Sequence, residues 1–282
     1  MSVAMEREQE FQFGQADFAK LQSLVYEKTG IVLKDQKKNM VYGRLARRLR
    51  TLKLSAFSDY INFIETPAGA DEMGNLINAI TTNLTKFFRE DHHFEHFRSV
   101  AMKESFDALR SGKQKRIRVW SAGCSSGEEP YSIAMSMVSA IPKIEKLDAK
   151  ILATDLDTNM LDTGRAGLYK SNCLDTISKE YTKRFTKIVD DGYVQISPKL
   201  RQFIAFKQLN LLHNWPMKGP FDVIFCRNVM IYFDNPTKQR LVDGFASMLR
   251  PGGWLYIGHS ESLLNQSGPF KLHGRTTYRK EL

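Results

Sequence analysis

The fold of this chain is decided by one stretch, Val119-Trp120-Ser121-Ala122-Gly123-Cys124-Ser125-Ser126-Gly127-Glu128-Glu129-Pro130. It has the pattern of a buried strand, a loop of small residues and the start of a helix, and small residues let the backbone approach a ligand closely. The loop lacks the Gly-x-Gly-x-x-Gly pattern of dinucleotide-binding proteins, and acids at a helix start suit a pyrophosphate poorly. Glu128 and Glu129 instead favour a positively charged ligand, such as an ammonium or sulfonium group. The alternative is that the two acids only complement the helix dipole.

Strand and helix patterns alternate on both sides of this stretch. Runs typical of buried parallel strands occupy residues 117–120, 151–153 and 221–226. Helical stretches occupy 128–140, 158–165 and 236–249; the turn Pro251-Gly252-Gly253 then precedes a strand at 254–258 and a terminal pair at 270–272 and 276–279. The alternation predicts an α/β fold with a doubly wound, mostly parallel sheet, whose ligand crevice lies beyond the carboxyl ends of the strands.

The alternation breaks between about residues 168 and 205. There the run 193–196 alternates apolar and polar residues directly after Asp190-Asp191-Gly192, a sequence typical of a hairpin turn. We expect an inserted antiparallel β-subdomain at this point. Its few strands would need to pack on the main domain to be stable.

The first part of the chain shows helical periodicity and almost no strand signal. Four apolar stripes predict four helices, and the first ends at Gly30, the residue type favoured just after a helix. The stripes are Phe18, Leu21 and Val25; Val41, Leu45, Leu49 and Leu52; Phe57, Tyr60, Ile61 and Ile64; and Met73, Leu76, Ile77 and Ile80. We therefore expect a small all-helical domain at 1–85 and the α/β domain at 86–282.

A second candidate site residue is Asp155, which closes the strand after the small-residue loop. A carboxylate at that place can accept both hydroxyls of a ribose, as in other nucleotide-binding α/β folds. Asp157 is the competing acid, although it could instead cap the following helix. Together with the glycine-poor loop and the acidic helix start, Asp155 indicates S-adenosylmethionine rather than a nicotinamide cofactor.

Composition narrows the partners and the compartment. The chain has 282 residues, a formal net charge of +10 and a pI of about 9.4, which indicates an acidic partner: nucleic acid, an anionic membrane surface or an acidic protein face. The three cysteines form no Cys-x-x-Cys pair, which argues against a disulfide framework and a zinc ribbon. Residues 1–10 have the character of a frayed tail and not of a signal peptide, and no apolar run is long enough to span a membrane. We expect a cytoplasmic protein.

The junction between the two parts carries the run Thr81-Thr82-Asn83-Leu84-Thr85-Lys86-Phe87-Phe88-Arg89-Glu90, which alone could be a helix cap with a hydrophobic plug. Three further runs accompany it: Ser126-Gly127-Glu128-Glu129-Pro130-Tyr131-Ser132-Ile133-Ala134, Phe225-Cys226-Arg227-Asn228-Val229-Met230-Ile231-Tyr232-Phe233 and Gly258-His259-Ser260-Glu261-Ser262. In combination these motifs closely resemble the CheR family of chemotaxis receptor methyltransferases. The resemblance extends from about Phe18 to Tyr278.

The resemblance implies a function and a set of site residues. Members of that family transfer methyl from S-adenosylmethionine to glutamates on the cytoplasmic helices of chemoreceptors, with a helical N-terminal domain and a methyltransferase domain that carries a small β-subdomain. Carried over, the donor-binding positions fall on Asn83, Thr85, Arg89, Glu129, Asp155, Asn210, Leu211, Arg227 and Asn228. The active-site tyrosine falls on Tyr232, and Arg89 is expected to share its catalytic role. The β-subdomain becomes a candidate contact for the C-terminal tail of a receptor.

A basic run in the helical part comprises Lys34, Lys37, Lys38, Arg44, Arg47, Arg48, Arg50 and Lys53. Such a run is ordinarily a solvated face. An acidic helical substrate would give it a function, and Arg44, Arg47 and Arg48 are then the expected substrate-binding residues.

Other functions are less well supported by the sequence. Amino-methylating enzymes of nucleic acids carry an Asn/Asp-Pro-Pro-aromatic segment where this chain has Cys226-Arg227-Asn228-Val229, and Cys226 has the surroundings of a core residue rather than of a nucleophile. A non-catalytic binding module on the same fold remains the alternative from another class. His92 and His96 stand at helical i, i+4 spacing, but no third ligand is identifiable, so no metal site is expected.

Overall fold

The computed structural model describes residues 10–190, 192–263 and 268–281, so residues 1–9 of the expected tail and Asp191 of the expected turn lie outside the described residues. The chain forms two compact units, Met1–Thr82 and Asn83–Leu282. Each unit has its own buried core. Among the described residues, no helix combines the length and the apolar character that crossing a membrane requires.

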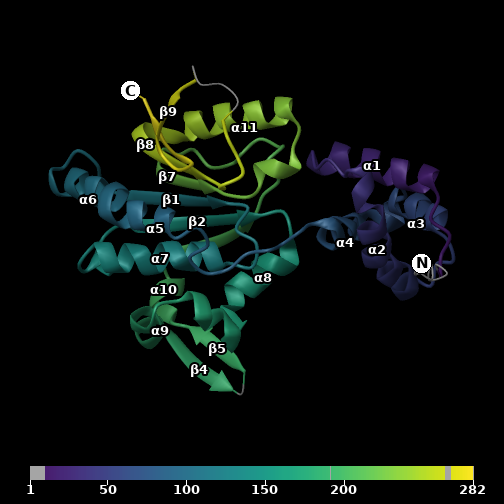
Figure 1. The fold of residues 1–282 in the computed structure, drawn as a ribbon, viewed down its shortest axis with the longest axis horizontal. Coiled ribbons are helices and arrows are strands. Elements are labelled where there is room, and N and C mark those ends of the chain that lie inside the picture. The colour runs from purple at the N-terminus through teal and green to yellow at the C-terminus, as the bar shows by residue number, and fades with distance from the viewer. Residues whose placement is uncertain (1–9, 191, 264–267, 282) are drawn as a thin grey trace, which may run out of the picture. The chain divides into compact units, whose positions relative to one another are not determined.

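The first unit is all helical (Figure 1), as expected. Its helices are α1 (Gln15–Thr29), α2 (Lys38–Leu52), α3 (Phe57–Ile64) and α4 (Ala70–Ile80), with short 3-10 turns at Asp35–Lys37 and Pro67–Gly69. The predicted apolar stripes, except Ile77, face one core, in which Phe18, Leu45 and Tyr60 are wholly buried. Gly30 ends α1 in the left-handed region at φ 69°, where a residue without Cβ is favoured.

The second unit is built on a seven-stranded sheet of order β6-β2-β1-β7-β8-β10-β9. The strands are β1 (Ile117–Ala122), β2 (Ala149–Asp155), β6 (Ile204–Gln208), β7 (Phe221–Cys226), β8 (Leu249–Ile257), β9 (Phe270–Gly274) and β10 (Thr277–Lys280). The first five are parallel, β10 pairs antiparallel with β8, and β9 pairs antiparallel with β10. From β1 the chain adds β2 and β6 in one direction and β7 and β8 in the other, which confirms a doubly wound sheet with a switch point between β1 and β7.

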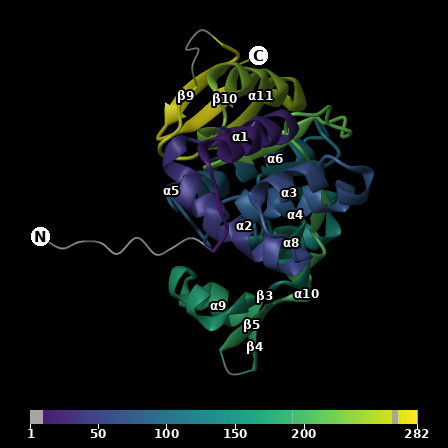
Figure 2. The ribbon, with the colours of Figure 1, turned by 90° about the vertical axis from the view of Figure 1, so that its right-hand side faces the viewer.

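Helices flank this sheet (Figures 1 and 2). They are α5 (His92–His96), α6 (Met102–Arg110), α7 (Glu128–Ala140), α8 (Thr158–Ala166) and α11 (Asn235–Met248), and a π-helical segment, Phe97–Ala101, joins α5 to α6. α7 and α8 pack against β2 and β6, whereas α11 packs against β8. The apolar faces of α5, α6, α7 and α8 and the strands form the main core around Trp254, Phe225 and Tyr131, whereas Phe245 of α11 packs against Trp120.

A small antiparallel sheet of order β3-β5-β4 is inserted after α8, as expected. It consists of β3 (Leu168–Lys170), β4 (Thr186–Asp190) and β5 (Tyr193–Ile196), together with α9 (Lys179–Phe185), α10 (Pro198–Arg201) and the 3-10 segment Ser171–Thr176. Its buried side chains, among them Tyr169, Val194 and Ile196, join the core of the main sheet. The chain then returns to the central sheet as β6, a strand that the sequence pattern did not reveal.

One local prediction was wrong. Pro251-Gly252-Gly253 was expected to form a turn before a strand at 254–258, but β8 already begins at Leu249. The pairing of β8 with β7 shifts between Phe221 and Val223, which are opposite Leu249 and Trp254, so the three residues form an irregularity inside the strand. Gly252 makes this possible because it adopts φ +71°.

Candidate active site

The loops that follow β1, β2, β7 and β8 meet at the carboxyl edge of the parallel strands, where doubly wound folds bind their ligands. Contact between the loops after β1 and β7 is close at the switch point. A Cβ added at Gly123 would lie 2.4 Å from a methyl group of Val229, so only glycine fits there. The small residues of the first loop are thus required by packing as well as by any ligand.

The loop after β1 is held against the end of β2 by its backbone. The N–H groups of Gly123 and Cys124 donate to the carbonyl of Thr154, at 2.8 and 2.9 Å, and the N–H of Ser125 donates to Asp155 Oδ2 at 2.7 Å. Ser125 has φ +48°, an uncommon conformation for a residue with a Cβ. These hydrogen bonds therefore fix the shape of the loop.

Asp155 and Asp157 have different roles. Asp155 Oδ1 accepts the N–H of Asp157 at 2.9 Å, and burial raises the pKa of the Asp155 carboxyl against these backbone hydrogen bonds. Asp157 caps α8 by accepting the N–H groups of Asn159 and Met160, and its other oxygen accepts the amide of Asn83 at 2.7 Å. A carboxylate offers about four acceptor positions, so Asp155 retains capacity for ligand hydroxyls.

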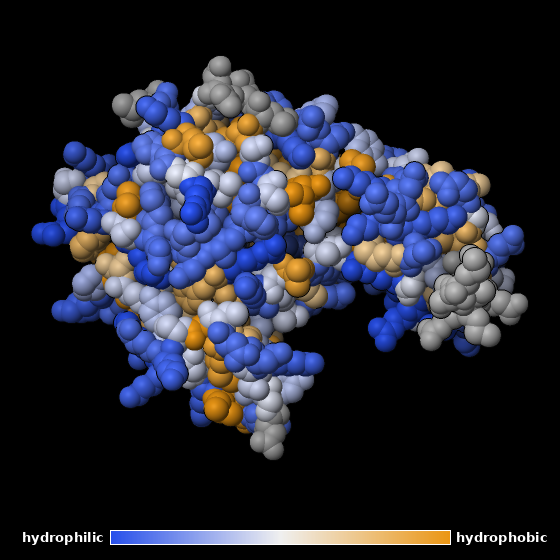
Figure 3. Space-filling view, in the orientation of Figure 1, coloured by the Kyte–Doolittle hydropathy of each residue, from blue (hydrophilic) through white to orange (hydrophobic). Residues whose placement is uncertain are grey.

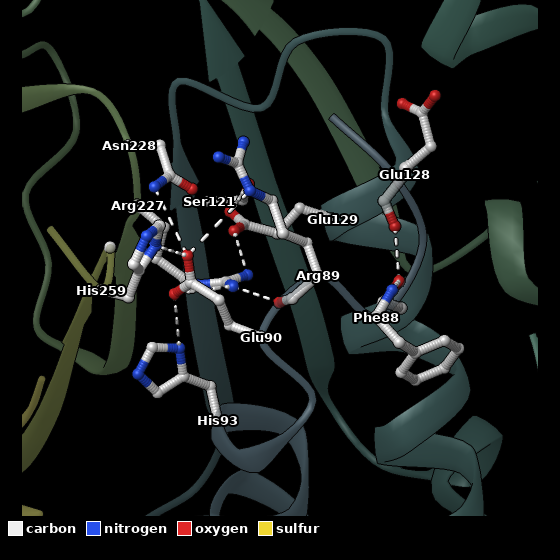
Figure 4. Close-up of polar contacts among 12 residues, drawn as sticks. Phe88, Arg89, Glu90, His93, Ser121, Glu128, Glu129, Arg227, Asn228 and His259 are labelled. Atoms are coloured by element: carbon white, nitrogen blue, oxygen red, sulfur yellow. Dashed lines mark hydrogen bonds and ion pairs between the residues drawn. The ribbon is translucent and has the colours of Figure 1, made fainter. Parts of the chain in front are cut away.

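The two acids at the start of α7 do not act as a pair. Glu129 is buried and accepts the Ser121 hydroxyl at 2.7 Å on one oxygen and Arg227 Nη1 at 3.0 Å on the other. Glu128 instead accepts the Ser126 hydroxyl, and it lies away from Glu129 (Figure 4). At the start of α7, Glu129 forms an ion pair with the guanidinium of Arg227. The two acids therefore do more than complement the helix dipole, because Glu129 forms a buried ion pair with Arg227. They also do not form a joint site for a cationic ligand, because their side chains have different partners.

Arg227 is the centre of a buried cluster. Its side chain is 2 % exposed and forms ion pairs with Glu129 at 3.0 Å and with Glu90 Oε2 at 3.2 Å. It also donates to the backbone carbonyl of Arg89, and its guanidinium lies over the ring of Phe94. Two carboxylates face the guanidinium of Arg227, and the side chain of Arg89 lies 4.0 Å from Glu90, so each acid of the cluster is paired with an arginine.

Glu90 belongs to this cluster, although the sequence did not single it out as a site residue. Its Oε1 accepts from His259 Nδ1 at 2.8 Å and from the amide of Asn228 at 3.4 Å. Burial would raise the pKa of Glu90, but the charge of Arg227 and the hydrogen bond from His259 together lower it to about 2. The signal in the sequence was its place at the end of the junction run.

Arg89 has its backbone in the cluster and its side chain at the surface. Its side chain is 26 % exposed, donates from Nη1 to the carbonyl of Leu84 at 2.8 Å and lies 4.0 Å from Glu90. Phe88 and Glu90, on either side, both have positive φ, at 50° and 58°, which fixes an unusual course of the backbone at Arg89. Thr85 is half-buried on the same segment.

The remaining expected site residues lie on the loops after β6 and β7. Asn210 turns the chain after β6 by accepting the N–H of Leu212 at 3.0 Å, and Leu211 accepts the indole N–H of Trp215. Asn228 adopts φ +59° just after β7, and Tyr232 lies half-buried at the end of the 3-10 turn Met230–Tyr232. The structure therefore brings Asn83 to Asp157 and joins Arg89, Glu129, Arg227 and Asn228 through one cluster.

The expected arginine face on α2 looks different in the structure. Arg44 donates from Nη1 to the carbonyls of Ala79, Ile80 and Thr81 at the end of α4. Arg48 forms two hydrogen bonds with the buried carboxylate of Glu72, at 2.8 and 2.6 Å. Both arginines therefore hold the helical unit together, whereas Arg47 is exposed.

Two of the histidines on α5, His93 and His96, have hydrogen-bond partners within the fold. His96 Nδ1 lies 2.8 Å from the hydroxyl of Tyr256, and His93 Nε2 lies 3.1 Å from the carbonyl of Arg275. Burial lowers the pKa of His93 to about 3, so this ring is neutral at pH 7. Within the described ranges, no group of three His, Cys, Asp or Glu side chains could hold a metal ion. The three cysteines are free thiols.

These residues fit S-adenosylmethionine, which combines ribose hydroxyls with a positively charged sulfonium. Asp155 supplies acceptor oxygens at the end of β2, and Gly123 leaves the switch point without a Cβ. The carboxylates of Glu90 and Glu129, each paired with an arginine, lie near the same edge, and carboxylates favour a nearby cation.

Comparison with known proteins identifies both units. Residues 16–81 match the all-alpha domain of the CheR methyltransferases, and residues 83–279 match the S-adenosylmethionine-binding domain of the same family. The chain is 44% identical over 260 residues to a probable chemotaxis protein methyltransferase of Rhizobium etli, with 91% of this chain and 96% of that protein covered. It is 39% identical to chemotaxis protein methyltransferase 2 of Pseudomonas aeruginosa and 40% identical to the chemotaxis protein methyltransferase of Salmonella typhimurium, with coverage of 94% or more on both sides. The chain therefore belongs to the CheR family of chemotaxis protein methyltransferases, and S-adenosylmethionine is its cofactor.

Proposed function

We propose that this protein transfers the methyl group of S-adenosylmethionine to glutamate side chains on the cytoplasmic helices of chemoreceptors, forming methyl esters for chemotactic adaptation. The names of the relatives support a chemotaxis methyltransferase. The observation that carries the choice of a carboxylate acceptor is the guanidinium of Arg89, which is partly exposed beside a buried cluster that already uses Arg227.

Methylation of a carboxylate does not require the enzyme to remove a proton from the acceptor. The pKa of a free glutamate side chain is about 4.3, so at neutral pH it is already the nucleophile and needs no general base. In agreement, His93 is buried, neutral and bound to a backbone carbonyl. Bound S-adenosylmethionine supplies an electrophilic methyl group on a positively charged sulfur. What remains for the protein is to place the acceptor in line with that methyl group.

Arg89 and Tyr232 are the proposed catalytic residues. The guanidinium would pair with the incoming carboxylate, and the hydroxyl of Tyr232 would orient it. The half-exposed position of Arg89 matters because a fully buried ion pair would stabilise the ground-state carboxylate and slow the attack.

The proposed donor site has direct and indirect members. Asp155, Asn83, Thr85, Asn210 and Leu211 lie on loops at the carboxyl edge and would contact the donor, with Asp155 accepting the ribose hydroxyls. Glu129, Arg227 and Asn228 would act through the buried cluster, which sets the charge of the site and the position of Arg89.

The receptor would meet two surfaces. Arg47 on α2 is the proposed steering residue for an acidic receptor helix, whereas Arg44 and Arg48 support it by holding α2 and α4 in place. The β-subdomain would take an extended receptor tail. Its edge strand β4 exposes Ile188 and Val189, by 70% and 49%, and Figure 3 shows apolar atoms gathered at that hairpin.

The test uses labelled S-adenosylmethionine and receptor cytoplasmic fragments. Label that enters the receptor and is released by alkali as a volatile product would identify a methyl ester, and receptor fragments with the glutamates changed to alanine should take up none. Alkali-stable label would contradict a carboxylate acceptor. Label in RNA or DNA in place of the receptor fragments would favour a nucleic-acid methyltransferase. Absence of donor binding in titration calorimetry would favour a non-catalytic module.

A further inference from the structure

The turn that carries Tyr232 is held by one buried carboxylate, that of Glu261. This side chain is 7% exposed and lies just after β8. Its Oε2 accepts the N–H groups of Gly258 at 2.6 Å and of Asn228 at 2.9 Å, and its Oε1 accepts the N–H of Ile231 at 3.1 Å. One carboxylate therefore joins the ends of β7 and β8 at the edge where the site lies.

The hydrogen bond to Ile231 reaches the start of the turn itself. The first N–H groups of a 3-10 or α-helical turn have no partner inside it, so an acceptor from outside fixes the turn in place. Within Met230–Tyr232 the chain closes through the N–H of Tyr232, which donates to the carbonyl of Val229 at 3.2 Å. Glu261 thus acts as the cap of the turn whose last residue is Tyr232.

The loops after β7 and β8, which Glu261 joins, are in close contact. A Cβ on Gly258 would lie 2.5 to 2.7 Å from atoms of Asn228, so the two loops touch directly. Asn228 has φ +59°, a conformation that asparagine adopts at a cost and that a partner for its N–H helps to maintain. Among the described residues, Glu261 forms no ion pair, so its charge is balanced by backbone N–H groups alone.

We propose that Glu261 is a positioning residue for methyl transfer: its carboxylate fixes the turn after β7 so that the hydroxyl of Tyr232 meets the acceptor carboxylate. This inference rests on the proposed role of Tyr232. A displacement of about 1 Å in a positioned group can lower a rate by about a hundredfold. The effect of losing Glu261 should therefore appear in the methyl-transfer step and depend on Tyr232.

The experiment is a double-mutant cycle on the single-turnover rate, with saturating S-adenosylmethionine and receptor fragment. Glu261→Gln keeps the size of the side chain but replaces an acceptor oxygen by a donor that faces an N–H group. We expect Tyr232→Phe and Glu261→Gln each to lower the rate by about tenfold or more. In the Tyr232→Phe background, Glu261→Gln should lower it by less than about threefold, because its effect passes through the lost hydroxyl.

The control is Asp222→Asn at the opposite end of β7. Asp222 is 4% exposed and likewise accepts a backbone N–H, from Arg118, as well as Arg250 Nε. Its substitution should lower the melting temperature and leave the single-turnover rate near that of the wild type. If Glu261→Gln does not fold, Glu261→Asp, which keeps the charge but shortens the reach, takes its place in the cycle with the same expected coupling.

The outcomes separate the two ideas. A wild-type rate for Tyr232→Phe would overturn the proposed role of the tyrosine. A slow Tyr232→Phe with a wild-type Glu261 variant, or with effects that multiply fully, would overturn positioning by Glu261 while leaving Tyr232 in its role. A rate loss in Asp222→Asn equal to that of Glu261→Gln would also overturn it, because general loosening of β7 would then explain both.

Discussion

Replacing Arg227 by methionine should destabilise the second unit severely, because it leaves two buried carboxylates without their cation. Arg227 is 2 % exposed and pairs with Glu129 at 3.0 Å and Glu90 at 3.2 Å. Removal of one partner from a buried ion pair costs about 3 to 5 kcal/mol, whereas the loss of an exposed pair costs about 1 kcal/mol or less. We expect the free energy of unfolding at pH 7 to fall by the larger amount.

The cost should shrink in acid. Burial already raises the pKa of Glu129 in the presence of Arg227, and loss of the guanidinium raises it further. In the variant this carboxylate takes up a proton at a higher pH than in the wild type, which removes the unpaired charge. The difference in stability between variant and wild type should therefore decrease as the pH falls from 7 to 5.

Urea unfolding followed by tryptophan fluorescence measures the second unit selectively. All three tryptophans lie in it, at Trp120, Trp215 and Trp254. Arg165→Met is the matched control, because its pair with Asp162 is largely exposed. Glu129→Gln combined with Arg227→Met should cost less than the sum of the single changes. A loss below about 1 kcal/mol at pH 7 for Arg227→Met would refute a buried ion-paired cluster.

Three further predictions follow from the same contacts. Asp155→Ala should weaken binding of S-adenosylmethionine by about 1 to 3 kcal/mol in titration calorimetry, with the exposed Asp162→Ala as control; unchanged affinity would remove Asp155 from the donor site. Arg47→Glu should raise the apparent KM for receptor fragments, most strongly at low salt and without changing donor affinity, whereas Lys20→Glu on α1 should not; equal kinetics for both variants at every ionic strength would make α2 an ordinary solvated surface. His93 has a pKa of about 3 in the fold against 6.5 ordinarily, so the unfolded chain binds the extra proton and stability is lost as the pH falls below 6.5. Between pH 6.5 and 4.5 this loss should amount to about 2 kcal/mol, and His93→Gln should abolish most of it in urea titrations; an unchanged pH dependence would contradict a buried neutral ring.

Much of the fold follows from local patterns, which a sequence carries directly. A helix face repeats every three to four residues and a cap acts within about four, so the stripe of Phe18, Leu21 and Val25, the end of α1 at Gly30 and the cap of α8 at Asp157 could all be predicted. The same holds for the strands and for the motifs that identify the family. The sequence did not predict β6, because this edge strand is short and half-exposed. Its apolar and polar residues do not alternate clearly enough to separate it from the β-subdomain before it.

The sequence by itself determined the two kinds of domain, the family and the order of most elements, and it proposed the residues of the site. Only the tertiary structure decided which hydrogen-bond and ion-pair partners each charged side chain has. Arg227 pairs with Glu129, which is 98 residues away in the sequence, and the N–H of Asn228 donates to Glu261, which is 33 residues away. Both pairings depend on which strands are neighbours in the sheet. Arg44 and Arg48 face carbonyls and a carboxylate on α4 instead of solvent for the same reason. Charge is visible in a sequence, but burial and partners are set by strand order and helix packing, and these fix whether a charge binds a substrate or holds the fold.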